Sequence, residues 1–196
     1  MPKRSLDIVG AVLGLIVLSP LWLALWIWIR RDSLGPGLYR QARVGKDGRP
    51  FRIAKFRTMV VDADRDWLPP ESAEALSDHY FQREDDPRIT RAGRFLRRTS
   101  LDELPNLWNV LVGEMSLVGP RPEVPEIVAL YTDEQRRRLS VKPGITGLAQ
   151  ISGRGELTTA ETIRYDLEYC KAPNIWQDLR ILFHTVGTVT GRHGAM

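Results

Sequence analysis

The sequence predicts an α+β fold that is predominantly helical and attached to a membrane through its N-terminal region. Three observations predict this class. Residues 8–29 are 22 residues without a charge, residues 38–59 contain two strand-like segments around a turn, and two later segments carry apolar residues at helical spacing. A chain of 196 residues suits one globular unit beside such an anchor. We therefore expect an anchor at residues 1–32 and a single further unit at residues 33–196.

The overall charge favours an anionic partner. The chain has 28 lysines and arginines against 24 acids, a net charge of +4 and a pI near 9.5. Lipid head groups, phosphorylated substrates and nucleic acid all fit this charge, but the apolar segment favours lipid and phosphate, so we expect no nucleic-acid partner. The single cysteine, Cys170, excludes an internal disulfide, and the sequence has no Cys/His spacing of a structural zinc site.

The apolar run of residues 8–29 has three competing interpretations. A straight helix of this length reaches about 33 Å, close to the thickness of a bilayer core, so a transmembrane span is the first. A cleaved signal peptide is the second, but three tryptophans occupy the place of its small-residue cleavage site. The third is a re-entrant hairpin, which enters the membrane and leaves it on the same side.

Two features favour the hairpin. Ser19-Pro20 lies in the middle of the run, where the proline removes a backbone donor and clashes with the preceding turn, so we expect a bend there. Basic pairs flank both ends, at residues 3–4 and 30–31, and a span would send one of these pairs across the membrane against the usual charge bias. Prolines also occur in true spans. The residues alone therefore favour the span and the hairpin equally.

Between the anchor and the central helix, the sequence predicts a hairpin and then an excursion. Residues 38–45 and 51–59 are expected to form two strands around a turn at Asp47-Gly48. Residues 62–86 hold nine acids against two arginines, which is typical of a solvated surface segment. Residues 87–98 reverse this balance, with five arginines and no acid.

The C-terminal half alternates between apolar helices and loops rich in Gly and Pro. An apolar stripe predicts a helix over residues 101–111. Residues 113–125 and 140–155 contain GEMSLVGPRPEVP and SVKPGITGLAQISGRG, and ordered loops of this kind usually carry functional sites. A second stripe predicts an amphipathic helix over residues 175–189, which packs on a core or lies in the membrane interface.

The most informative run, RRTSLDE, ends in the adjacent acids Asp102 and Glu103. One interpretation is structural: Ser100 and Glu103 form a capping box for the following helix, whose start Pro105 makes irregular. The other is chemical: adjacent carboxylates project about 100° apart on a helix, so one attacks phosphorus while the other holds Mg²⁺. The residues alone favour the structural interpretation.

The motifs taken together resemble those of the monotopic phosphoglycosyl transferases, the bacterial sugar transferases that begin lipid-linked glycan assembly. The resemblance rests on KRSLD before an apolar run broken by Ser19-Pro20, and then on KFRTM, SLDELPNLWNVLVGEMSLVGPRP and KPGITGLAQISGR in that order. This resemblance covers about residues 3–190, and the chain is most similar to the minimal catalytic form of the family. It implies a re-entrant hairpin, interfacial amphipathic helices and a catalytic unit at residues 33–196 on the cytoplasmic face of the bacterial inner membrane.

The resemblance also implies a two-step reaction. Asp102 is the implied nucleophile, which attacks the sugar-linked phosphate of a UDP-sugar, releases UMP and becomes a phosphosugar ester. A polyprenol phosphate, expected to be undecaprenyl phosphate, then attacks this ester to give a polyprenyl-diphospho-sugar. Glu103 is the implied ligand of Mg²⁺. Phosphate or nucleotide contacts are implied for five basic residues, namely Lys55, Arg97, Arg121, Lys142 and Arg154.

Other interpretations remain open beside this one. Asp62-Ala63-Asp64 resembles the metal-binding DxD of soluble nucleotide-sugar glycosyltransferases, although solvated surface is the favoured interpretation in so acidic a segment. A second function is therefore a membrane-associated glycosyltransferase that uses Asp62 and Asp64 for metal and forms no covalent intermediate. A basic membrane-surface binding protein, in which the Asp102-Glu103 pair is only a helix cap, is a third function. Gly10 and Gly14 allow close helix approach, either within the chain or in a homodimer.

Overall fold

The computed structural model describes residues 2–65, 68–72, 75–76, 86–153 and 157–191. The fold is predominantly helical with two small sheets, which confirms the predicted α+β class. The first half of the chain contains α1 (Pro2–Val17), α2 (Ser19–Asp32), β1 (Leu38–Val44), the short 3₁₀ helix η1 (Lys46–Gly48), β2 (Pro50–Phe56), α4 (Arg91–Thr99) and the 3₁₀ turn η2 (Leu101–Glu103). The second half contains α5 (Asn106–Val112), β3 (Ser116–Val118), α6 (Pro125–Ala129), α7 (Asp133–Arg136), η3 (Arg137–Ser140), β4 (Gly144–Thr146), α8 (Leu148–Ser152), α9 (Thr159–Lys171) and α10 (Ile175–Gly191).

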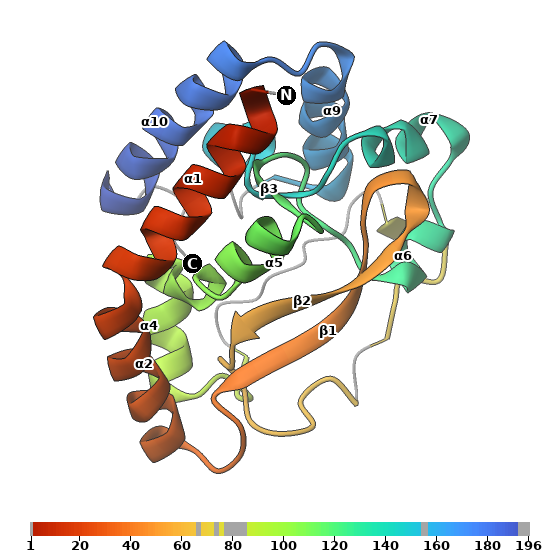
Figure 1. The fold of residues 1–196 in the computed structure, drawn as a ribbon. Coiled ribbons are helices and arrows are strands. Elements are labelled where there is room, and N and C mark those ends of the chain that lie inside the picture. The colour runs from red at the N-terminus through yellow and green to blue at the C-terminus, as the bar shows by residue number, and fades with distance from the viewer. Residues whose placement is uncertain (1, 66–67, 73–74, 77–85, 154–156, 192–196) are drawn as a thin grey trace.

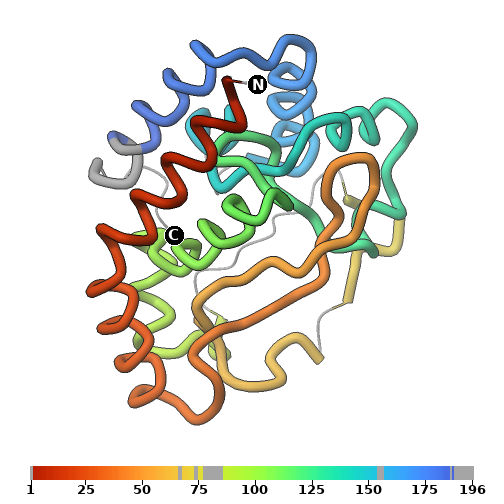
Figure 2. Tube along the Cα trace, viewed as in Figure 1, coloured from red at the N-terminus to blue at the C-terminus, as the bar shows by residue number. Residues whose placement is uncertain are grey.

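The N-terminal helices form one side of the molecule and take part in its core. They lie opposite the β1–β2 hairpin, with α5 between the two (Figure 1). The chain trace brings the start of α1 beside α10, although these helices come from opposite ends of the sequence (Figure 2). Leu25 and Ile29 of α2 are buried in one cluster with Phe56 of β2 and Leu96 of α4. This packing places α2 against the elements that carry the basic motifs.

The N-terminal helix pair bends at the predicted break. α1 ends at Val17 and α2 begins at Ser19, whose hydroxyl donates to the Ile16 carbonyl at 2.8 Å. Pro20 lies in the first turn of α2, where its missing N–H is tolerated. The two helices are bent by 62° relative to each other and meet the length and hydropathy criteria of a membrane span only as a pair. Among the described residues, no single helix is long and apolar enough to cross a bilayer.

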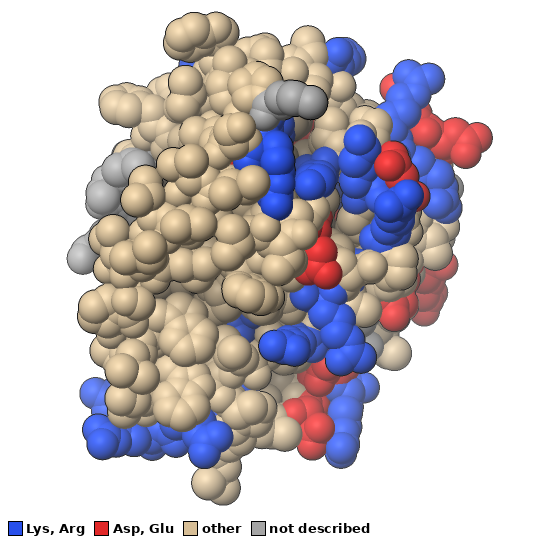
Figure 3. All heavy atoms as spheres, viewed as in Figure 1, with Lys and Arg blue, Asp and Glu red and all other residues tan. Residues whose placement is uncertain are grey.

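A broad apolar surface covers the outer side of these helices. Figure 3 shows this face almost without charged side chains and with Lys and Arg at its edge. Large apolar side chains are exposed on three helices: Val9, Leu13, Ile16 and Val17 on α1, Leu21, Leu23 and Trp28 on α2, and Trp176, Leu179 and Phe183 on α10. So extended an apolar surface indicates contact with a membrane or with another protein.

The two glycines of α1 face side chains of the same chain. A Cβ placed at Gly10 would lie 2.6 Å from Leu117 Cδ1, and one at Gly14 would lie 2.9 Å from Leu107 Cδ1. The glycines therefore let α1 approach α5 and β3 closely. This arrangement favours local packing over a dimer contact on that face of the helix.

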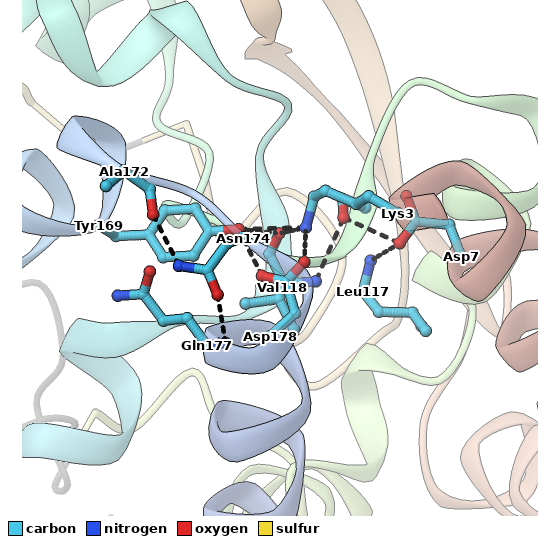
Figure 4. A network of polar contacts seen from close by, with 10 residues as sticks. Lys3, Asp7, Leu117, Val118, Tyr169, Ala172, Asn174, Gln177 and Asp178 are labelled. Carbon is cyan, nitrogen blue, oxygen red and sulfur yellow. Dashed lines mark hydrogen bonds and ion pairs between the residues drawn. The ribbon is translucent and has the colours of Figure 1, made fainter. Parts of the chain in front are cut away.

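Charged residues in the first two turns of α1 fix this helix to the rest of the molecule. Lys3 Nζ donates to the Asp178 carboxylate at 2.7 Å and to the Tyr169 hydroxyl at 3.1 Å (Figure 4). Asp7 is 2% exposed and accepts hydrogen bonds from the Ser116 hydroxyl and from the Leu117 backbone N–H, both at 2.9 Å. The charges of the KRSLD motif thus join α1 to β3 and α10.

The two sheets differ in how far the sequence predicts them. The antiparallel β1–β2 hairpin forms as predicted, with Asp47 and Gly48 at positive φ in its turn. The parallel pair β3 and β4 was not predicted, because each strand has only three residues and lies in a Gly/Pro-rich segment. A Cβ at Gly144 would lie 2.1 Å from Gly119 N, so the close approach of these strands requires glycine.

The helices of the central segment also differ from the prediction. The arginine-rich segment forms α4, which the sequence did not predict. The Thr90 side chain caps this helix, and the Ala92 N–H donates to the Asp32 carboxylate. The helix α9 was not predicted either. The single helix expected over residues 101–111 is divided into η2 and α5. Pro105, which has no N–H, lies at this division and gives it a physical reason.

Candidate active site

The site is built on the turn between α4 and α5. Ser100 ends α4 in the left-handed conformation, with φ 55°, so the chain changes direction just before Asp102 and Glu103. The capping-box interpretation is wrong: the Ser100 side chain makes no capping bond to η2, and the Glu103 carboxylate binds two basic side chains instead. The change of direction presents both acids to β2 and to the loop after β3.

Glu103 is held by two cations. Lys55 Nζ lies 3.0 Å and Arg121 Nη1 lies 2.7 Å from the same oxygen, Glu103 Oε1. Burial alone would raise the pKa of Glu103, but the adjacent Arg121 and Lys55 lower it to about 2. The carboxylate is therefore fully ionised at neutral pH and is fixed in place.

Asp102 has a different environment from its neighbour. Its carboxylate makes no hydrogen bond or ion pair with the residues that the structure describes, although it remains partly exposed. Burial raises the pKa of Asp102, Lys55 opposes this shift, and the charge of Glu103 adds to it. Of the two adjacent acids, Glu103 is thus bonded directly to two cations, and Asp102 has no direct bond to a cation among the described residues.

Arg97, together with Lys55 and Arg121, forms a basic surround of Asp102. Its Nε donates to the Thr58 hydroxyl at 3.1 Å, which fixes the side chain beside the end of β2. Burial lowers the pKa of Arg97 and the Asp102 carboxylate raises it, so the two groups are within electrostatic reach. The structure therefore brings together five of the residues that the sequence indicated: Lys55, Arg97, Asp102, Glu103 and Arg121.

The remaining predicted residues lie elsewhere. Lys142 Nζ lies 3.4 Å from the Cβ position of Gly113, at the end of α5 away from Asp102. Burial and the neighbouring Arg4 lower the pKa of Lys142. Ser19 and Pro20 lie at the helix bend, and Arg154 lies outside the described residues.

The acids of the DxD sequence do not join this site. Asp62 pairs with Arg65 at 3.2 Å, and Asp64 accepts a hydrogen bond from the Tyr39 hydroxyl at 3.3 Å. Asp64 lines a separate, open hollow of about 310 Å³ with Gln41 and other residues. These contacts favour the solvated-surface interpretation of the acidic segment.

The donor set at Asp102 and Glu103 fits a magnesium ion that substrate completes. Mg²⁺ is commonly held by one or two carboxylates together with substrate phosphates and water. Both cations donate to Glu103 Oε1, and Oε2 accepts no hydrogen bond from the described residues. No group of three or more His, Cys, Asp or Glu side chains gathers for a metal anywhere in the described part of the chain.

Sequence reasoning missed several buried polar residues around this site. Arg43 and Arg138 donate to backbone carbonyls of the loop that carries Arg121. Asn106, one turn after Asp102, is 1% exposed, and its amide has no hydrogen-bond partner among the described residues. The only sequence signal for the two arginines is the pair of prolines in GPRP. Prolines prevent regular secondary structure in this loop, so its backbone carbonyls need hydrogen-bond donors from other parts of the chain.

Comparison with known proteins gives relatives that match nearly all of this chain. Galactosyl transferase CpsE of Streptococcus agalactiae is 46% identical over 98% of the chain and 43% of its own length. Undecaprenyl-phosphate galactose phosphotransferase of Salmonella typhimurium is 44% identical over 98% of the chain and 41% of its own length. Exopolysaccharide production protein ExoY of Sinorhizobium fredii is 39% identical over 98% of the chain and 87% of its own length.

These relatives differ in length. The chain spans about two fifths of each of the first two relatives and most of the third. The family model described as bacterial sugar transferase matches residues 1–192, which include both acids and their basic partners. By this match and these identities, the chain belongs to the bacterial sugar transferase family.

Proposed function

We propose that this protein transfers a sugar 1-phosphate from a UDP-sugar to a polyprenol phosphate, releasing UMP. The names of two relatives, which specify undecaprenyl-phosphate galactose and glucose phosphotransferases, support this substrate class. The observation that carries the proposal is the contrast between adjacent acids. Glu103 is ionised and held by Lys55 and Arg121, whereas Asp102 has no partner among the described residues and lies within the same basic surround.

The proposed reaction has two displacements at one phosphorus atom. An Asp102 carboxylate oxygen attacks the phosphorus bonded to the sugar, and the bond from that phosphorus to the bridging oxygen breaks, so UMP leaves with the electron pair. An oxygen of polyprenol phosphate then attacks the same phosphorus and displaces the Asp102 carboxylate. The products are polyprenyl-diphospho-sugar and UMP, and Asp102 is regenerated.

The basic residues stabilise the charge that moves in these steps. Arg97 and Arg121 offer planar groups for phosphate oxygens, and Lys55 adds a compact charge. Mg²⁺ bound by Glu103 Oε2 would supply further neutralisation of the diphosphate. Because Glu103 holds Lys55 and Arg121 at one oxygen, both cations are positioned before substrate arrives.

We further propose that α1 and α2 form a re-entrant hairpin in the bacterial inner membrane, with the catalytic part on the cytoplasmic face. The 62° bend and the exposed apolar side chains of both helices support this arrangement. The polyprenol phosphate head group lies at the membrane surface, so a shallow anchor would hold Asp102 at that depth. Basic residues at both ends of the pair also favour one common side.

Paired substitutions test the covalent route. We expect Asp102→Asn to abolish UMP release from a UDP-sugar by the full chain in membranes, because the amide is not a nucleophile. Asp64→Asn is the matched control and is expected to retain nearly full release, since Asp64 contacts Tyr39 and not the site. A phosphosugar adduct on Asp102, detected by mass spectrometry without acceptor, would support the proposal. Release of UDP instead of UMP would contradict it.

A further inference from the structure

The backbone segment that carries Arg121 is held by hydrogen bonds from other segments of the chain. Residues 120–123 form no helix or strand, and the two prolines in this segment cannot donate backbone hydrogen bonds. Four consecutive carbonyls nevertheless each accept a hydrogen bond. The donors, in order from residue 120 to residue 123, are Gly144 N at 2.8 Å, Arg138 Nη2 at 2.9 Å, Arg43 Nη1 at 3.1 Å and Val44 N at 2.9 Å.

Two of these four donors are guanidinium groups, and the more deeply buried is Arg138. Its side chain is 3% exposed and forms an ion pair with Asp166 of α9, whose side chain is 1% exposed. Arg138 also donates to the Tyr131 hydroxyl. A charge this deeply buried is destabilising unless it is paired and hydrogen-bonded. Asp166 and Tyr131 pair with the two terminal nitrogens of Arg138, whereas Nε has no hydrogen-bond partner among the described residues. These contacts aim the guanidinium at the Arg121 carbonyl.

Arg43 donates to the next carbonyl from another element, β1. It extends from β1, donates to the Pro122 carbonyl, and lies 3.5 Å from the Glu123 carboxylate. Burial lowers the pKa of Arg43, while Glu123 opposes this shift. The backbone that carries Arg121 is therefore fixed by Arg43 of β1 and by Arg138 of η3, which pairs with Asp166 of α9.

We propose that Arg138, oriented by Asp166, and Arg43 are positioning residues that hold the Arg121 guanidinium ready at Glu103 for the diphosphate of the donor. The inference rests on the proposed function, because it assigns a purpose to residues that do not touch substrate. Displacement of a catalytic group by about 1 Å can lower a rate by about a hundredfold. Fixing the 120–123 backbone before substrate binds avoids that loss.

A double-mutant cycle tests the proposal on the full chain in membranes. Asp166→Asn, Arg121→Lys and the double variant are compared with the wild type for kcat and KM of UMP release. We expect Asp166→Asn to lower kcat/KM by about 10- to 100-fold. In the Arg121→Lys background the same change should lower it by less than about threefold, because the group it positions is already altered.

A matched control separates positioning from general stability. Asp178 is also a fully buried aspartate that pairs with a cation, Lys3, but its contacts do not reach residues 120–123. We expect Asp178→Asn to lower the melting temperature and to have the same effect on kcat/KM in both Arg121 backgrounds. Should Asp166→Asn not fold, Tyr131→Phe removes one hydroxyl from Arg138 and is expected to show the same coupling at a smaller magnitude.

The outcomes distinguish the two proposals. Equal losses from Asp166→Asn in the two Arg121 backgrounds, or wild-type kcat/KM in Asp166→Asn, would overturn the positioning role while leaving the reaction in place. A wild-type chain that releases UDP, or no nucleotide, would instead contradict the proposed function. UMP release with strong coupling between residues 121 and 166 supports both.

Discussion

At the scale of single residues, Asp102 and Glu103 are distinguished by their partners. Lys55 and Arg121 meet at one oxygen of Glu103, so this acid holds two partly exposed cations in place. Asp102 faces the same cations without a direct bond to them among the described residues. Under the proposed reaction, Glu103 therefore stabilises the site and Asp102 is the group that reacts.

This assignment predicts opposite effects of two conservative substitutions on stability. Glu103→Gln leaves Lys55 and Arg121 without the carboxylate that bonds them directly, so we expect the free energy of unfolding at pH 7 to fall by about 2 kcal/mol. Asp102→Asn removes a carboxylate whose pKa burial has raised, so we expect unchanged or slightly greater stability. Thermal unfolding in detergent measures both, and an equal loss in the two variants would contradict the assignment.

The pH dependence of the Glu103 effect follows from its pKa. Glu103 has a pKa of about 2 in the folded protein, against an ordinary value of 4.5. A lowered folded-state pKa gives stability that is present above the ordinary value and is lost as pH falls toward the folded value. The difference between the wild type and Glu103→Gln should therefore be constant above about pH 5 and shrink between about pH 4 and pH 2.

The sequence indicated the residues of the site unequally, for physical reasons. Asp102 and Glu103 are adjacent, and Lys55, Arg97 and Arg121 lie in short motifs, so resemblance identified all five together. Arg43 and Arg138 bind backbone carbonyls of a proline-containing loop far away in sequence. No local pattern encodes such a contact, because it depends on how β1 and η3 are placed beside the loop.

At the scale of elements, the sequence predicted those features whose determinants lie within the element. The β1–β2 hairpin has its own turn, and the α1–α2 bend has its own proline, so both appear where the sequence placed them. α4 and the β3–β4 pair depend on partners instead. Asp32 accepts from the start of α4, and each strand of the parallel pair is stabilised by the other.

The bend between α1 and α2 carries a prediction about membrane topology. Single cysteines at Ser5 and Leu34, introduced in a Cys170→Ser chain, should react with a membrane-impermeant maleimide from the same, cytoplasmic side. Both positions are exposed and lie at opposite ends of the pair. Val17→Cys, 70% exposed beside the bend, serves as the lipid-buried control and should not react from either side. Labelling of Ser5→Cys and Leu34→Cys from opposite sides would contradict the re-entrant hairpin and support a transmembrane span.

At the scale of the whole molecule, the N-terminal helices α1 and α2 share two core clusters with the rest of the chain. Ala11 of α1 is buried with Phe51, Val110 and Met115, and Ile29 of α2 is buried with Phe56. Lys3 and Asp7 add polar bonds to α10 and β3. The apolar outer face and the packed inner face of the same helices therefore have separate roles.

Truncation tests this dual role and the expected boundary at residue 32. We expect residues 33–196 alone to be protease-sensitive and to release no UMP, because removing α1 and α2 exposes the partners of Ala11 and Ile29. The control keeps both helices and replaces Ile16 and Val17, which are 66% and 70% exposed, with serine. This variant should weaken membrane attachment but leave protease resistance unchanged, since neither side chain is in the core. A truncated chain that folds and releases UMP would show instead that the catalytic part is independent of its anchor.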